Sequence, residues 1–130
     1  MAITKNDGRQ EVIAAYVSFA FGDLTTTVAE DAIELPANAR IVGGQLDVTT
    51  AWDSATSDVA VVSIGSETVL SSTSIAATGS TPFTDTQGVK TTTVTDATIT
   101  WTGTGAAPAA GVGMLTILYV VEGRACFTQG

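Results

Sequence analysis

The side chains that could perform chemistry are few, and histidine is absent from the 130 residues. Without histidine, the chain has no Ser-His or Cys-His pair to activate a nucleophile and no imidazole to bind a metal ion. Cys126 is the single cysteine, so no disulfide can form within the chain. We expect Cys126 to be a small apolar residue and not a reactive thiol, because no nearby cationic cluster would lower its pKa.

Three carboxylates, Asp47, Asp53 and Asp58, surround one predicted polar turn. Paired carboxylates can serve glycoside hydrolysis, and oxygen-rich loops can bind calcium. A glycosidase also needs a deep cleft lined by aromatic side chains, but the chain has only two Trp and two Tyr. The ligand spacing of an EF-hand calcium loop is absent as well. We therefore interpret this group as a solvated acidic turn.

Two other motifs could bind ligands. Gly103-Thr104-Gly105 resembles half of a phosphate-binding loop, but no lysine follows it and it does not begin a helix, so we interpret it as a turn. Trp52 and Trp101 could form a platform for stacking sugars. Because Trp101 shares a strand face with Ile99, we favour a place in the core or in a contact between subunits. The sequence thus predicts no catalytic residue, no metal site and no cofactor, and the chain is predicted not to be an enzyme.

The composition limits the partners that the protein can bind. The net charge is −8, and the five basic residues are scattered singly, so no patch could neutralise several phosphates. We expect no nucleic-acid partner. The acidity disfavours an anionic membrane surface, and the apolar runs are too short to span a bilayer. The first residues lack the apolar stretch of a secretory signal, so the chain is either made in the host cytoplasm or already processed, and we favour cytoplasmic synthesis.

Short segments rich in Val, Ile and Thr, separated by Gly, Asp, Asn or Pro, predict strands. The segments are 11–21, 31–36, 40–50, 59–65, 89–94, 97–102 and 114–122, and residues 67–70 extend the fourth. They predict an all-β fold, an antiparallel two-sheet β-sandwich or jelly roll of about seven or eight strands. We expect residues 11–130 to form this single domain and residues 1–10 to be a flexible N-terminal arm.

Three local features are also predicted. The pair Gly43-Gly44 indicates a bulge or bend within the strand 40–50. Segments 40–50 and 59–65 are expected to pair as a hairpin around the polar turn between them. Residues 71–86 are polar and rich in small side chains, which is typical of a long connection from one sheet to the other, with a short helical turn possible near Ile75.

The last strand, Met114 to Glu122, is apolar on both faces. One face of such a strand can meet the opposite sheet of a sandwich, but the other face needs a second cover. A loop, a terminus or a neighbouring subunit could supply it. The sequence therefore indicates a protein that assembles with copies of itself or with a larger structure.

Three stretches together resemble a known family: residues 31–44, then Leu46-Asp47-Val48 with Trp52, and residues 103–125, which close on Tyr119-Val120-Val121-Glu122-Gly123-Arg124. They resemble the small, Thr- and Ala-rich structural proteins of tailed-phage virions, of the head-decoration or cement type. The resemblance implies a β-sandwich that self-associates, often as a trimer, on the outer face of an assembled capsid. It carries over no catalytic residue.

From this resemblance we expect a capsid decoration protein that binds the major capsid protein lattice on the virion surface as a homotrimer and stabilises the head. Deletion of residues 1–7 is expected to weaken attachment but not the fold. The alternatives are a tail or fibre module that contacts a host glycan near Trp52 and residues 103–111, and a minor coat or tail subunit. The predicted subunit or capsid contacts are Met1, Ala2, Ile3, Thr4, Lys5, Trp52, Leu118, Val120 and Arg124.

Overall fold

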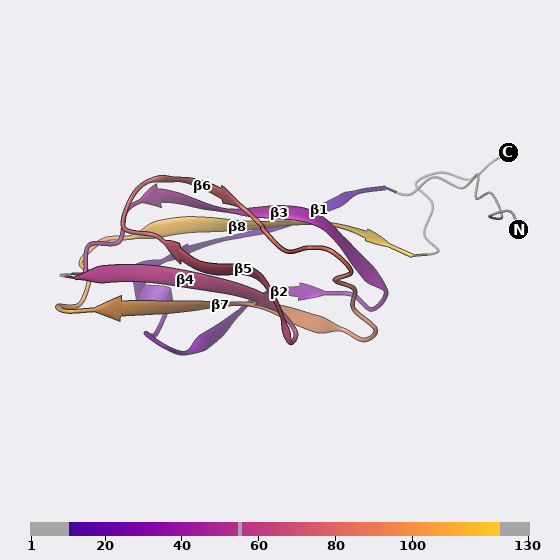
Figure 1. Ribbon diagram of the computed structural model, residues 1–130, viewed down its shortest axis with the longest axis horizontal. Helices are drawn as coiled ribbons and strands as arrows, with labels where there is room; N and C mark the ends of the chain where they lie inside the picture. The colour runs from indigo at the N-terminus through magenta and orange to yellow at the C-terminus, as the bar shows by residue number, and fades with distance from the viewer. Residues whose placement is uncertain (1–10, 55, 123–130) are drawn as a thin grey trace, which may run out of the picture.

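The computed structural model describes residues 11–54 and 56–122, which form eight strands in two four-stranded sheets (Figure 1). A short 3-10 helix, η1 (Phe21–Asp23), follows the first strand. The strands are β1 (Ile13–Ala20), β2 (Ala29–Leu35), β3 (Ala39–Thr50), β4 (Ser57–Ile64), β5 (Glu67–Ser74), β6 (Gly79–Pro82), β7 (Thr95–Thr104) and β8 (Val112–Val121).

The order of the strands is that of a jelly roll. The first sheet runs β1-β8-β3-β6, the second runs β2-β7-β4-β5, and every neighbouring pair is antiparallel. The first strand thus pairs with the eighth, the second with the seventh, the third with the sixth and the fourth with the fifth. The chain reverses at the β4–β5 turn, so its second half runs antiparallel to its first half. The four strand pairs that result are divided between the two sheets. The predicted all-β sandwich is confirmed.

The core lies between the two sheets and follows from the alternation of side chains along each strand. In β8, Leu115, Ile117 and Tyr119 point inwards and are buried, while the residues between them are partly exposed. Strand β4 alternates in the same way, so both sheets contribute one face to a shared apolar layer. The largest fully buried apolar side chains are Trp52, Leu35, Leu46, Leu70, Ile75, Ile99, Leu115, Ile117, Val62 and Val69.

The predicted bulge is confirmed, and the predicted hairpin is wrong. The register between β3 and β8 shifts between Ile41 and Gly43. However, β3 and β4 lie in different sheets, because β3 already has β8 and β6 as its two neighbours. The segment between them crosses from one sheet to the other, and the indole of Trp52 is buried in that crossing.

The segments 71–86 and 89–94 differ in part from the prediction. The chain does cross between sheets after β5, as expected, but residues 71–74 complete β5 and residues 79–82 form β6 at the edge of β3, so much of the predicted connection is strand. No helical turn forms near Ile75, which is buried and whose backbone N–H donates to Asp58 O. Residues 89–94 make only an isolated bridge, between Lys90 and Arg40, because the buried hydroxyl of Thr91 ties this segment to the β2–β3 turn.

Four aromatic rings of the sandwich lie against glycines. A Cβ atom at any of these glycines would meet the ring at less than an ordinary van der Waals distance. Because glycine has no Cβ, each ring can occupy the space beside it. The pairs are Gly44 with Phe83, Gly103 with Trp101, Gly111 with Trp52, and Gly113 with Phe19.

Candidate assembly surface

The outer face of the sheet β1-β8-β3-β6 carries apolar side chains where a solvent-facing sheet usually carries polar ones. Ala14 of β1 lies opposite Leu118 of β8, and Tyr16 lies two residues further along the same face. Val12 is 54% exposed and Tyr16 is 71% exposed. We define the apolar sheet face as the outward side chains of Val12, Ala14, Tyr16, Met114, Leu118 and Val120.

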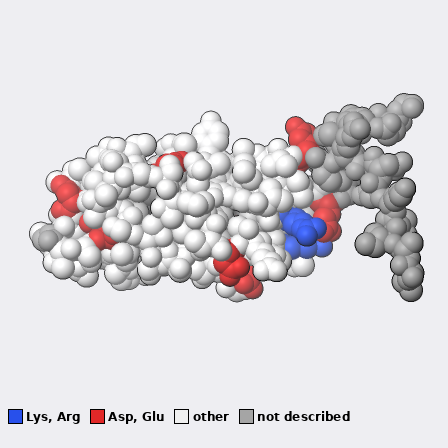
Figure 2. All heavy atoms as spheres, turned by 45° about the horizontal axis from the view of Figure 1, so that its top comes forward, with Lys and Arg blue, Asp and Glu red and all other residues white. Residues whose placement is uncertain are grey.

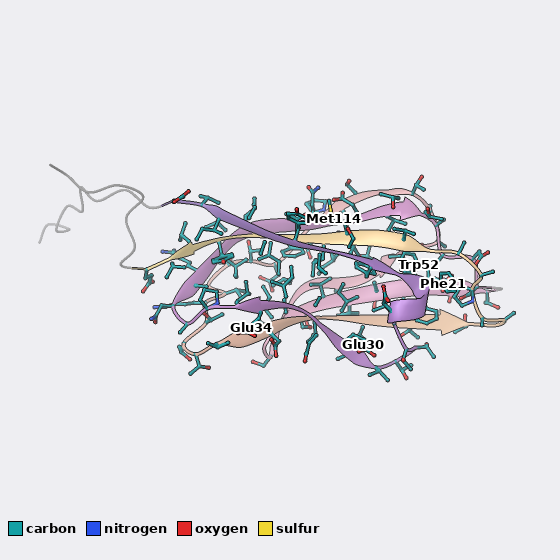
Figure 3. The ribbon with its side chains drawn as sticks, turned by 180° about the vertical axis from the view of Figure 1, so that it is seen from behind. Phe21, Glu30, Glu34, Trp52 and Met114 are labelled. Atoms are coloured by element: carbon teal, nitrogen blue, oxygen red, sulfur yellow. The ribbon has the colours of Figure 1, made fainter. Side chains whose placement is uncertain are left out.

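The polar members of this face are mostly uncharged. Ser18 and Thr116 lie among the apolar residues, and Gln45 Nε2 donates to the carboxylate of Asp47 at 3.0 Å. The hydroxyl of Ser80 also donates to Asp47. Figure 2, which brings this sheet forward, shows a mostly uncharged surface, and Figure 3 shows Met114 on the outside of the sheet. Covering this face therefore removes few charges from water, which keeps its desolvation cost low.

The outer face of the sheet β2-β7-β4-β5 has a different chemistry. The outward side chains of β7 include Thr98, Thr100 and Thr102, which alternate with the buried residues of that strand. Glu34 of β2 lies directly opposite Asp96 of β7, and two carboxylates in such a cross-strand pair repel each other. Water solvates hydroxyls and carboxylates well, so this face suits solvent better than a dry contact.

The two basic residues of the described chain, Arg40 and Lys90, lie at the end of the sandwich where β1 begins and β8 ends. Lys90 Nζ lies 2.8 Å from Glu122 Oε2. The hydrogen bond and charge of Lys90, with a smaller contribution from Arg40, lower the pKa of Glu122. A depressed pKa makes the pair stabilising above the ordinary value of 4.5, and that contribution is lost as the pH falls through the lowered pKa.

The predicted acidic turn is not a solvated cluster, because its three carboxylates point to different places. Asp58 is 1% exposed, and its Oδ1 accepts a hydrogen bond from Trp101 Nε1 at 2.8 Å while its Oδ2 accepts one from Ser54 N at 2.9 Å. Asp53 is exposed, and its Oδ1 accepts from the backbone of Ala109 and Ala110. Asp47 belongs to the opposite sheet. These carboxylates hold the fold together and leave no paired acid and base.

The described residues offer no metal site, and a groove lies at one edge of the sandwich. No group of three or more His, Cys, Asp or Glu side chains in residues 11–54 and 56–122 could hold a metal ion. A groove of about 220 Å³ between β1 and β2 has a floor that includes Leu24 and Ile99. No helix within these ranges has the length and apolar character to cross a membrane.

The structure places two predicted contact residues on the apolar sheet face and corrects a third. Leu118 and Val120 are partly exposed on that face. Trp52 is 1% exposed and packs in the core against Phe19, with ring centroids 5.8 Å apart, so it is not a surface contact (Figure 3). The predicted contacts Met1, Ala2, Ile3, Thr4, Lys5 and Arg124 lie outside the described residues.

The prediction missed Val12 and Tyr16, although the signal was present. Segment 11–21 alternates so that Val12, Ala14 and Tyr16 share one face and the opposite residues share the other. Its opposite face supplies the buried side chain of Phe19. The first strand, like the last, is apolar on both faces, and only one face of each can lie in the core. The two segments therefore indicate the same outward apolar surface.

Comparison with known proteins shows that the fold is shared with chains from phage capsids. No family model matches the sequence, and no curated protein is similar to it at a significant level. A chain of the cyanophage Pam1 capsid asymmetric unit matches with a TM-score of 0.67 and 23% identity, over 94% of this chain and 92% of that one.

Two further capsid structures contain chains of the same fold. The capsid of Ralstonia phage GP4 matches with a TM-score of 0.64 and 16% identity, over 95% of this chain and 93% of that one. The acid-stable capsid of Helicobacter pylori bacteriophage KHP30 matches with a TM-score of 0.61 and 19% identity, over 85% and 87%. Because both chains are covered almost completely, each matching chain has nearly the same size as this one.

Proposed function

We propose that this protein is a non-enzymatic structural component of a phage virion, a decoration protein that binds the outer face of the major capsid protein lattice and stabilises the head. The observation that carries the proposal is the apolar sheet face on a jelly roll whose fold is shared, over nearly the whole chain, with chains of phage capsids. A group of neighbouring exposed apolar side chains is typical of a contact site.

The proposal includes a homo-oligomer, with a trimer favoured. Closed cyclic symmetry lets identical surfaces meet around an axis and leaves no growing edge. An oligomer that spans neighbouring coat subunits also combines several weak contacts into stable attachment. Ala14, Val12 and Val120 of this face support this role, because Ala and Val side chains lose little conformational entropy when they are buried.

The glycan-binding alternative has lost its main support. It relied on Trp52 as an exposed stacking residue, and the ring lies in the core. Trp101 is 7% exposed, and its indole N–H is bonded to Asp58. A subunit that builds the lattice by itself remains an outcome of the test below, because it would form shells or tubes without added coat protein.

The test measures attachment to capsids of the same phage that lack this protein. Tyr16→Asp places a charge on the apolar sheet face, and we expect attachment to fall at least about tenfold, since burial of an unpaired charge is costly. Val94→Asp is the matched control, because Val94 is 61% exposed but precedes β7 and lies off that face. Urea unfolding should give similar stabilities for both variants.

Two results would contradict the proposal. One is the absence of attachment by the wild-type protein at saturating concentration. The other is attachment that is unchanged by Tyr16→Asp. Electron microscopy of the purified wild-type protein completes the test. Shells or tubes formed without coat protein would show that the protein builds a lattice by itself and is not a decoration protein.

A further inference from the structure

The four edge strands of the sandwich differ in how well they are protected against pairing with another chain. Edges are usually protected by proline, charge, shortness or a bulge. Strand β6 has four residues and ends at Pro82. Strand β2 contains three acidic residues and a register shift, and strand β5 pairs with β4 through two register shifts. These three edges are protected.

Strand β1 has none of these protections. Its eight residues, Ile13–Ala20, include no charge and no proline, and its pairing with β8 runs without a register shift. Within the described residues β8 is its single hydrogen-bonded neighbour. By the rules that govern sheet edges, β1 is a template for an added strand.

The hydrogen-bond pattern shows which backbone groups such a strand would meet. Phe21 N donates to Gly111 O at 2.9 Å, in the same register as the β1–β8 pairs. Bonding alternates along an antiparallel pair, so Val17 and Phe19 also bond to β8. The N–H and C=O groups of Ala14, Tyr16 and Ser18 therefore point away from β8, towards the free edge.

The free edge ends at a defined point. Ala20 N, the next group in this series, donates to Asp23 Oδ2 at 2.8 Å. Because this donor already has an acceptor, an added strand could not bond to it, and the free edge ends at Ala20. Within β1, three residues with one donor and one acceptor each remain available.

A groove lies beside this edge, where β1 of one sheet runs along β2 of the other (Figure 3). Its volume is about 220 Å³. Its lining includes three acidic residues, Asp23, Glu30 and Asp31, among the apolar residues Val17, Phe19, Leu24, Ala32 and Ile99. Alternate side chains of a strand added to β1 would enter this groove.

We infer that the free edge of β1 binds an extended segment of a partner protein, with apolar side chains at alternate positions and a lysine or arginine near the carboxylates of the groove. A second copy of this chain fits less well, because pairing β1 with β1 would bring the same carboxylates of both copies together. The inference rests on the proposed function for the identity of the partner, which would be the coat protein.

The first experiment uses the wild-type protein and a synthetic peptide that alternates Val with Thr and carries Lys at both ends. Amide hydrogen exchange followed by NMR should show fast exchange of Ala14, Tyr16 and Ser18 in the free protein. Peptide binding should slow these amides at least about tenfold and leave Val17 and Phe19, which are already bonded to β8, unchanged. A peptide with Glu in place of Lys should bind more weakly.

Two results of this experiment would overturn the inference. In one, the three amides are already protected in the free protein, so the edge is covered by the protein itself or by a second copy. In the other, the peptide leaves their exchange unchanged even at saturating concentration.

The second experiment separates the inference from the proposed function. Ser18→Pro removes a donor of the free edge without removing a bond to β8, and proline is tolerated at such edge positions. Ser18→Ala keeps the donor and is the control. If wild-type protein and Ser18→Ala attach to capsids and Ser18→Pro does not, the edge binds the capsid.

Two other outcomes are also decisive. If all three proteins attach equally, the decoration function stands and the strand-pairing inference fails. If none attaches but the wild-type protein binds the peptide, the inference stands and the decoration function fails. The hydrogen-exchange result does not depend on the folding of the proline variant.

Discussion

Asp58 shows how a single carboxylate can connect distant segments of this fold. It lies on β4, is almost fully buried, and uses a different oxygen for each of its two hydrogen bonds, one to the indole of Trp101 and one to the backbone of Ser54. Its own backbone oxygen accepts from Ile75 N. Asp58 therefore joins β4 to β7 and to the two segments that cross between the sheets, the one before β4 and the one after β5.

The geometry predicts different effects of amide substitution at two aspartates. Asp58→Asn would turn an NH2 group towards one of the two donors, and we expect a loss of about 1–3 kcal/mol in the free energy of unfolding, the cost of a buried donor without an acceptor. Asp53 accepts both of its bonds at one oxygen, which an asparagine keeps. Asp53→Asn should therefore change stability by less than about 0.5 kcal/mol.

Urea unfolding of the two variants measures this difference. Equal stabilities would contradict the assignment of Asp58 as a structural hydrogen-bond centre. At this scale the sequence predicted little, because three aspartates at similar spacing looked equivalent. Their roles depend on which segments surround them, and some of those segments are far away in the chain: Trp101 is 43 residues from Asp58.

At the scale of the strands, the glycines of β3 have two different functions. A Cβ at Gly44 would contact the ring of Phe83 and lie 2.7 Å from Thr116 O, whereas a Cβ at Gly43 would lie 3.7 Å from Leu118 Cδ1, an ordinary contact. Gly44 makes room on the inner face of the bulge, and Gly43 lies under the apolar sheet face.

We therefore expect Gly44→Ala and Gly43→Ala to differ in stability. Overpacking at Gly44 should lower the free energy of unfolding by about 1–3 kcal/mol. Gly43→Ala should change it by less than about 1 kcal/mol, because the added methyl group finds space. Thermal or urea unfolding of both variants tests this, and a Gly44→Ala variant as stable as the wild type would show that the ring of Phe83 is not held there.

The strands themselves were predictable, but several of their partners were not. Alternation of apolar residues in 11–21, 97–102 and 114–122 gave the correct strands and, for Ile99 and Trp101, the correct buried face. The predicted hairpin of 40–50 with 59–65 is wrong because these neighbouring segments of the chain lie in different sheets. In a jelly roll most partners are distant in the chain, and no local pattern encodes them.

At the scale of the whole molecule, the two outer faces predict which side assembles. Leu118 and Val61 are a matched pair, since each points outwards from an inner strand of its sheet and is partly exposed. Leu118→Lys should convert the expected trimer to a monomer at the same concentration, because three like charges would be buried in the contact. Val61→Lys should leave the mass unchanged.

Light scattering of the purified proteins measures the mass. A monomeric wild-type protein, or a trimer that survives Leu118→Lys, would contradict an oligomer built on the apolar sheet face. The sequence predicted this face in part, from the doubly apolar last strand. The alternation of segment 11–21 also indicates Val12 and Tyr16, but only the pairing of β1 with β8 joins them to the last strand in one face.

The pairing of β1 with β8 also has a consequence during translation. The nascent chain completes β1 early, but its sheet neighbour β8 is the last of the described strands to be made, about 100 residues later. At about 5–20 residues per second, the ribosome leaves β1 without that neighbour for about 5–20 s. An uncharged apolar strand exposed for that time can associate with other nascent chains, so the yield of folded protein should depend on how quickly β8 is released or on a chaperone that shields β1.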